Sequence, residues 1–151
     1  MTFFQFEADF TESLRCIPMQ VRYKLDTCGI KLKLPQWNQF SDRDRHVLVE
    51  MPCQTHPEIQ TYRDFLCDLI RDRTGDVAKE LPIDPHPPWN CDDRLPAEVL
   101  EKTQTCGVTL TLEQWANLTP LKRFVLIKLS RPSHENKNFV PALGEFGLTY
   151  T

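Results

Sequence analysis

One stretch of this chain, residues 27–37, is written again 78 residues later as residues 105–115. Both copies read Thr-Cys-Gly, continue with alternating leucines and close on Gln-Trp. The match extends without a gap over residues 17–52 and 95–130, and a match of that length indicates an internal duplication. At 151 residues the chain has the length of one ordinary domain. We therefore predict a single domain, residues 1–151, that contains two unequal copies of one unit.

The first copy opens on the pattern of an amphipathic helix. Its apolar residues recur in steps of three and four, which is the spacing of one helix face: Leu14, Ile17, Val21, Leu25 and Cys28. Pro18 is expected in the first turn of this helix, and Gly29 stands where a left-handed residue often ends a helix. The first Cys-Gly is therefore predicted to be a helix end.

Further helix signals predict an all-α fold. Ser41 with Asp44 three positions on resembles a capping box, and Thr55 followed by Pro57 begins a longer helix over residues 57–74. After the second copy, the apolar residues near the end of the chain predict one last short helix: Phe139, Leu143 and Phe146.

Two other segments interrupt this helical pattern. Residues 30–34 and 108–112 alternate in polarity, as a short strand or an extended connection does, and the two segments can pair with each other. Residues 76–94 hold four of the 12 prolines, so they are predicted to form a stiff, extended linker between the copies. The linker also contains Leu81, Ile83 and Trp89, so we expect it to run across the surface of one or both halves.

Charge and hydropathy exclude several classes of protein. The net charge is −3 and the 18 basic residues are dispersed, whereas a nucleic-acid-binding protein concentrates them in a patch. No segment approaches the roughly 20 apolar residues that cross a bilayer, and the first residues lack the pattern of a signal peptide. We expect a cytoplasmic protein without a membrane or nucleic-acid partner.

The six cysteines are the side chains with the most chemical potential. None forms a C-x-x-C, and none has zinc-finger spacing with a histidine, so reduced and mostly buried thiols are expected. The duplication retains Cys28 and Cys106 together, which makes them the candidate thiols. They are predicted to be two equivalent buried thiols below helix caps, with a redox or cluster role as the alternative. No motif of a hydrolase, phosphate-binding loop or metal site is present, so the sequence predicts no enzyme, cofactor or metal.

The N-terminal segment has an unusual density of phenylalanine. Phe3, Phe4, Phe6 and Phe10 must be buried against the core, or they form an exposed apolar patch that a partner covers. If they serve a partner, the candidate surface comprises these four rings together with Arg15, Arg22 and the linker aromatic Trp89.

Three segments resemble the nitrate reductase-associated protein family: Phe4–Phe10, Ser13–Met19 and Val21–Leu32. The resemblance covers nearly the whole chain, including Gln36-Trp37 and the second Cys-Gly with Trp115. That family is found chiefly in cyanobacteria, beside the genes of nitrate assimilation. The resemblance implies a non-enzymatic accessory factor whose partner is assimilatory nitrate reductase, acting in maturation, stability or electron delivery. It carries over no catalytic residues.

Two other functions fit parts of the sequence. The thiols can belong to a cysteine-based carrier of a metal or an iron–sulfur cluster. Paired helices around a short turn also occur in helix-turn-helix regulators, although the negative charge and the lack of a basic recognition helix weigh against that class.

Overall fold

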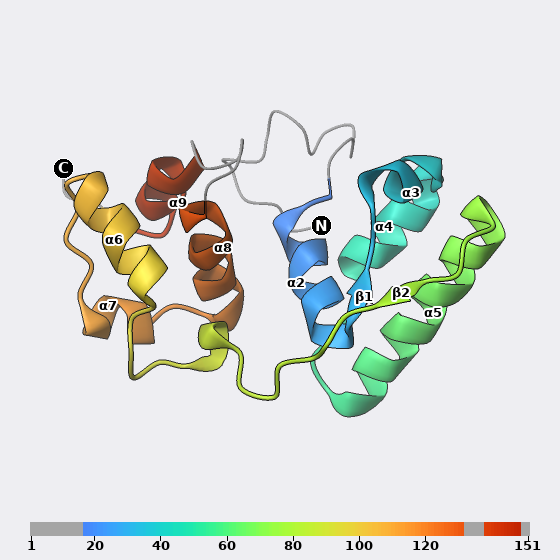
Figure 1. Ribbon diagram of the computed structural model, residues 1–151, viewed down its shortest axis with the longest axis horizontal. Coiled ribbons are helices and arrows are strands. Elements are labelled where there is room, and N and C mark those ends of the chain that lie inside the picture. The colour runs from blue at the N-terminus through green and yellow to red at the C-terminus, as the bar shows by residue number, and fades with distance from the viewer. Residues whose placement is uncertain (1–16, 132–137, 149–151) are drawn as a thin grey trace. The chain divides into compact units, whose positions relative to one another are not determined.

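The computed structural model describes residues 17–131 and 138–148, and it is mostly helical with one small sheet (Figure 1). The all-α prediction is confirmed. Two compact units make up the chain, one ending at Ile83 and one beginning at Asp84. This boundary lies inside the predicted linker. In the described part of the chain, every helix is too short or too polar to cross a bilayer.

Unit 1 is built around one long helix. Its elements are α2 (Met19–Cys28), β1 (Ile30–Lys31), α3 (Leu34–Gln39), α4 (Asp42–Glu50), α5 (His56–Thr74) and β2 (Lys79–Glu80). α5 begins at the N-cap Thr55 as predicted, with the Thr55 hydroxyl accepting from the Glu58 N–H. Gly75, with φ 76°, ends the helix. α2 and α3 both pack against α5, so the apolar faces of all three helices meet in one core.

The predicted capping box of α4 also ties two helices together. The Ser41 hydroxyl accepts from the Asp44 N–H at 3.1 Å, while the Asp44 carboxylate accepts from the Ser41 N–H at 3.0 Å. The same carboxylate accepts from Arg73 Nε of α5 at 2.9 Å, and this bond holds the pKa of Asp44 below its ordinary value. The Asp44 carboxylate therefore caps the start of α4 and also binds Arg73 near the end of α5.

Residues 30–34 and 108–112, which the sequence allows to pair, do not pair with each other in the described chain. β1 pairs instead with β2 of its own unit, antiparallel, with Ile30 opposite Glu80 and Lys31 opposite Lys79. β2 begins a few residues after α5 ends, so the chain returns to β1 only after α3, α4 and α5 have formed. In the second copy, the Val108 N–H donates to Thr103 O at 2.9 Å, which closes the end of the preceding helix and removes a donor that a ladder would use.

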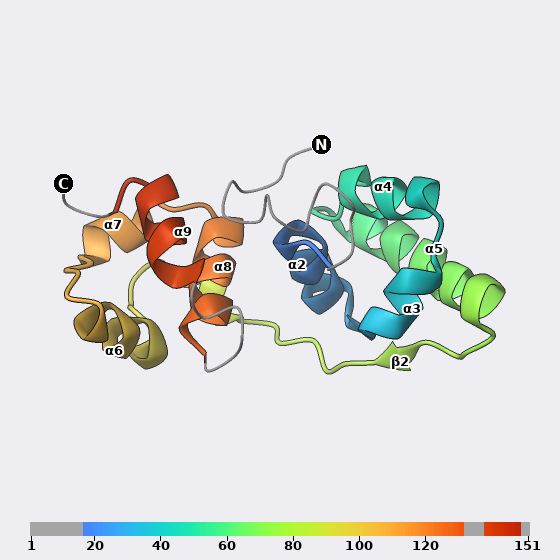
Figure 2. The same ribbon diagram turned by 90° about the horizontal axis from the view of Figure 1, so that it is seen from above.

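Unit 2 repeats the order of the first three helices of unit 1. It comprises η2 (Pro88–Asn90), α6 (Ala97–Thr105), α7 (Leu112–Ala116), α8 (Pro120–Ser130) and α9 (Phe139–Glu145). The starts of α6, α7 and α8 lie 78 residues after those of α2, α3 and α4, which is the offset of the sequence repeat. α9, the predicted last helix, packs against α8 (Figure 2). The origin of the two copies by duplication stays an inference from the sequence.

Two local details differ from the sequence predictions. Pro18 is the N-cap of α2 rather than a residue of its first turn, and Leu14 lies outside the described residues. The linker is not extended throughout, because Pro88–Asn90 forms a turn of 3₁₀ helix in which the Asn90 N–H donates to Pro87 O. Proline fixes φ near −65°, a value that suits a 3₁₀ turn as well as an extended chain.

Candidate functional site

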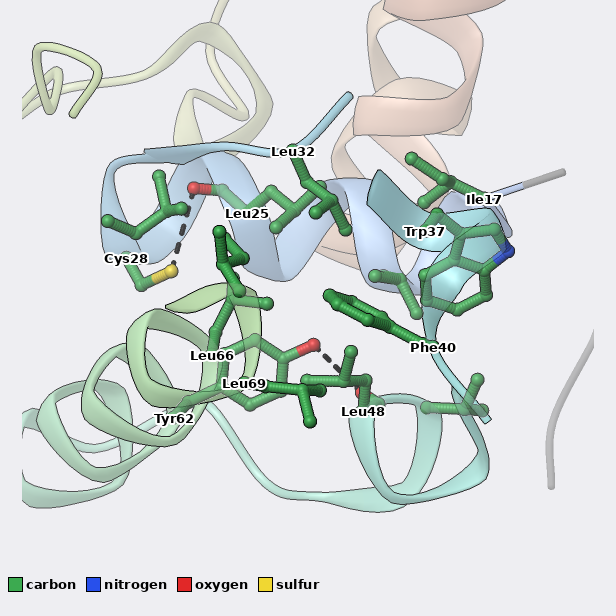
Figure 3. Close-up of a cluster of buried hydrophobic side chains, with 14 of the residues drawn as sticks. Ile17, Leu25, Cys28, Leu32, Trp37, Phe40, Leu48, Tyr62, Leu66 and Leu69 are labelled. Carbon is green, nitrogen blue, oxygen red and sulfur yellow. Dashed lines mark hydrogen bonds between the residues drawn. The ribbon is translucent and has the colours of Figure 1, made fainter. Parts of the chain in front are cut away.

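The first candidate thiol, Cys28, is sealed inside unit 1. It is the last residue of α2 and is 0% exposed, in a cluster with Tyr62 and Leu66 of α5 (Figure 3). Its Sγ donates to Leu25 O at 3.7 Å. Burial raises the pKa of the thiol from 9.0 to about 12. Because the thiolate is the nucleophile and the metal ligand, a thiol held protonated in this way is chemically inert.

The second candidate thiol, Cys106, has the same backbone position but a different environment. It caps α6 and is followed by Gly107 with φ 72°, just as Gly29 with φ 74° follows Cys28. Cys106 is only half-buried. The 19-residue α5 follows α4 and covers the first thiol, whereas the 7-residue α9 follows α8. The two helix ends have the same left-handed glycine after the cysteine. The prediction that both thiols are buried is wrong, because Cys106 is only half-buried.

The remaining cysteines of the described chain are also free thiols. Cys53 is buried, and burial raises its pKa from 9.0 to about 11, while Cys67 and Cys91 are half-buried. Cys16 lies outside the described residues. Within residues 17–131 and 138–148, no three side chains of the ligating types converge on a point where a metal ion could sit. A thiol-based carrier stays a prediction.

A buried lysine, which the sequence reasoning missed, joins α2 to the end of α4. The Lys24 ammonium donates to Val49 O and Met51 O, each at 2.6 Å, and lies 5.6 Å from the centroid of the Tyr62 ring. Burial lowers the pKa of Lys24. The free carbonyls at a helix C-terminus attract a cation, so this amine is a structural cap rather than a nucleophile. The sequence does contain one sign of this lysine, because the 78-residue offset of the repeat places Lys102 at the position equivalent to Lys24.

Replacing Lys24 by methionine is expected to destabilise unit 1 by about 1–3 kcal/mol, because methionine keeps the packing but leaves two carbonyls without their donor. Lys31→Met is the control, because it removes from the same unit an exposed ammonium group that has no hydrogen bond with a described residue. Urea unfolding of both variants measures the difference. Equal losses in the two variants would contradict a special role for Lys24.

The predicted partner surface is described only in part. Phe3, Phe4, Phe6, Phe10 and Arg15 lie outside the described residues. Arg22 Nε donates to Ile17 O at 3.0 Å, so part of its guanidinium holds the start of α2. Whether these residues contact a partner stays a prediction.

Trp89, the other member of that surface, belongs to the framework of unit 2. Its ring packs edge-on against Phe124 of α8 with centroids 5.1 Å apart, and its carbonyl accepts from Arg123 Nη1 at 2.9 Å. The turn Pro88–Asn90 is therefore packed against α8, and the Trp89 side chain is half-buried.

A basic depression on unit 1 is a further candidate site, which the sequence reasoning did not find. Its volume is about 230 Å³, and it is lined by Lys31, Lys33, Gln36, Asp76, Val77 and Lys79. The alternation predicted for residues 30–34 positions two of these side chains, because Ile30 and Leu32 are buried while Lys31 and Lys33 are exposed. The third lysine arrives from β2, which no local pattern shows.

The neutral and acidic groups of this depression are already paired. Gln36 donates through Nε2 to Asp76 Oδ2 at 3.0 Å and accepts from the Lys33 N–H at 2.9 Å. Glu80, next to the depression, pairs with Arg63 of α5. The three ammonium groups have no hydrogen bond or ion pair with any described residue. The depression therefore offers cationic charge to a molecule from outside.

Comparison with known proteins identifies one family. The family model of the conserved nitrate reductase-associated proteins matches residues 3–146, which include both units. No curated protein and no solved structure matches the chain significantly.

Proposed function

The chain belongs to the family of conserved nitrate reductase-associated proteins, and from that membership we propose that it is a non-enzymatic accessory protein of assimilatory nitrate reductase. The family match over residues 3–146 is the observation that carries the proposal. The role is to bind the reductase and to support its maturation, its stability or its supply of electrons.

The reactive side chains buried in unit 1 are engaged in structural hydrogen bonds, which supports a binding function rather than catalysis. The Cys28 thiol, the Lys24 amine and the Tyr62 hydroxyl each bond to a main-chain carbonyl inside unit 1. A catalytic group must instead reach a substrate from within a pocket. The basic depression is open and its ammonium groups are exposed, as in a surface that contacts another protein.

Co-purification tests this function. The tagged chain is incubated with a native extract of nitrate-grown cells, and the retained nitrate reductase activity is measured against the tag alone. We expect the chain to retain the reductase, and we expect deletion of its gene to lower nitrate reduction in the cells. A chain that retains no reductase, together with unchanged nitrate reduction after deletion, would refute the proposal.

A further inference from the structure

The exposed lysines of the described chain gather at one place. Only Lys31, Lys33 and Lys79 are exposed, since the other described lysines are buried or half-buried. All three line the basic depression. The protein as a whole has a net charge of −3, so this local excess of cations runs against the overall charge.

Folding alone does not favour this arrangement. Lys31 and Lys79 stand directly opposite each other in the β1–β2 ribbon, and like charges at such positions destabilise a ladder. Neither amine forms an ion pair with a described residue. Glu80 is paired with Arg63, and the Asp76 carboxylate, which keeps its charge, accepts from the neutral amide of Gln36. Departures from the local rules of stability concentrate where a protein binds something.

We propose that the basic depression, together with the exposed Val77 at its wall, docks an acidic segment of a protein partner. The charge of the three lysines is complementary to carboxylates spaced along an extended chain. Val77 is 91% exposed and supplies an apolar contact beside them. The proposal rests on the proposed function where the partner is nitrate reductase, because the depression is then the place at which the reductase binds.

The lining of the depression argues against other anionic ligands. A single-stranded nucleic acid stacks its bases on aromatic rings, and the residues that line the depression include none. A small oxyanion requires converging donors that enclose it, whereas Gln36 is already bonded and the depression is open. Carboxylates on an extended peptide need only separated cations at a surface.

A labelled peptide of glutamates tests the surface without any natural partner. We expect fluorescence anisotropy to show binding at low salt that weakens at about 0.15 M, where the Debye length is about 8 Å. Lys79→Glu should weaken the affinity about tenfold. Arg43→Glu, at an exposed arginine of α4 away from the depression, is the matched control because it changes the net charge equally.

The outcomes separate a docking surface from its alternatives. Lys79→Glu places an opposite charge across from Lys31, so its Tm should equal or exceed that of the wild type, and a lost affinity then does not come from unfolding. Equal weakening by Arg43→Glu would overturn the proposal, because the effect would follow net charge alone. Tighter binding of a single-stranded oligonucleotide or of inorganic phosphate than of the peptide would overturn it as well.

The capture of nitrate reductase then distinguishes this proposal from the proposed function. If the wild type retains the reductase and Lys79→Glu does not, the depression is the docking site. If both retain it equally, the docking proposal fails while the accessory function stands. If neither retains the reductase although the glutamate peptide binds the wild type, the proposed partner is wrong and the acidic-segment surface remains.

Discussion

Between about pH 9 and pH 11 the protein is expected to lose stability steeply, because two buried thiols resist ionisation only in the folded state. Burial raises the pKa of Cys28 from 9.0 to about 12 and that of Cys53 from 9.0 to about 11. In this window the unfolded chain releases these protons and the native chain retains them. Each thiol then lowers the free energy of unfolding by about 1.4 kcal/mol per pH unit, an effect that is absent below pH 9.

Cys28→Ala isolates the contribution of one thiol. The difference in unfolding free energy between wild type and Cys28→Ala should shift by about 1.4 kcal/mol per pH unit from pH 9 to 11, in favour of the variant. Burial lowers the pKa of Lys24, which acts in the opposite direction, but this effect is present in both proteins and cancels. Urea unfolding under reducing conditions measures the curves, with Cys106→Ala controlling for removal of a thiol from a helix end. Parallel curves for wild type and Cys28→Ala would contradict the assignment.

The helix boundaries could be predicted because their causes are local. Thr55 and Glu58 lie three residues apart, and Gly75 ends the same helix through its own backbone freedom. In the second copy, the Thr111 hydroxyl likewise accepts from the Gln114 N–H, three residues on, at the start of α7. Such features depend on a few neighbouring residues, so a pattern in the sequence is enough to find them.

The features that sequence reasoning missed depend on residues far apart in the chain. Lys31 and Lys79 lie opposite each other only because β2 pairs with β1 after α5. The residues around Lys79 carry no pattern that predicts this strand pairing. Lys24 reaches Val49 O from 25 residues away. Likewise, Cys28 and Cys106 stand in the same Thr-Cys-Gly, and the difference in their burial comes from helices that follow later in each unit. Local pattern therefore predicted the helices, while the ribbon, the lysine cap and the depression required the tertiary structure.

Gly29→Ala is expected to cost about 2–5 kcal/mol, whereas Gly107→Ala at the equivalent helix end should cost about 1–2 kcal/mol. Both glycines are left-handed, with φ of 74° and 72°, so alanine bears the same backbone penalty at each. A Cβ on Gly29 would lie 2.6 Å from Ile83 Cγ1 and 3.0 Å from Leu81 O, but one on Gly107 would meet nothing within 4 Å. The added crowding costs about 1–3 kcal/mol.

The difference between the two glycine variants tests how the linker is attached to unit 1. The Leu81 N–H donates to Gly29 O at 2.8 Å, so the linker cannot withdraw from a new Cβ without breaking the bond that continues the β1–β2 ribbon. Equilibrium urea unfolding of Gly29→Ala and Gly107→Ala measures the two losses. Equal losses would mean that residues 81–83 do not rest on the end of α2. A larger loss for Gly29→Ala, with loss of amide protection at Leu81, is the expected result, because only in the first copy does the twice-written Cys-Gly support a strand as well as end a helix.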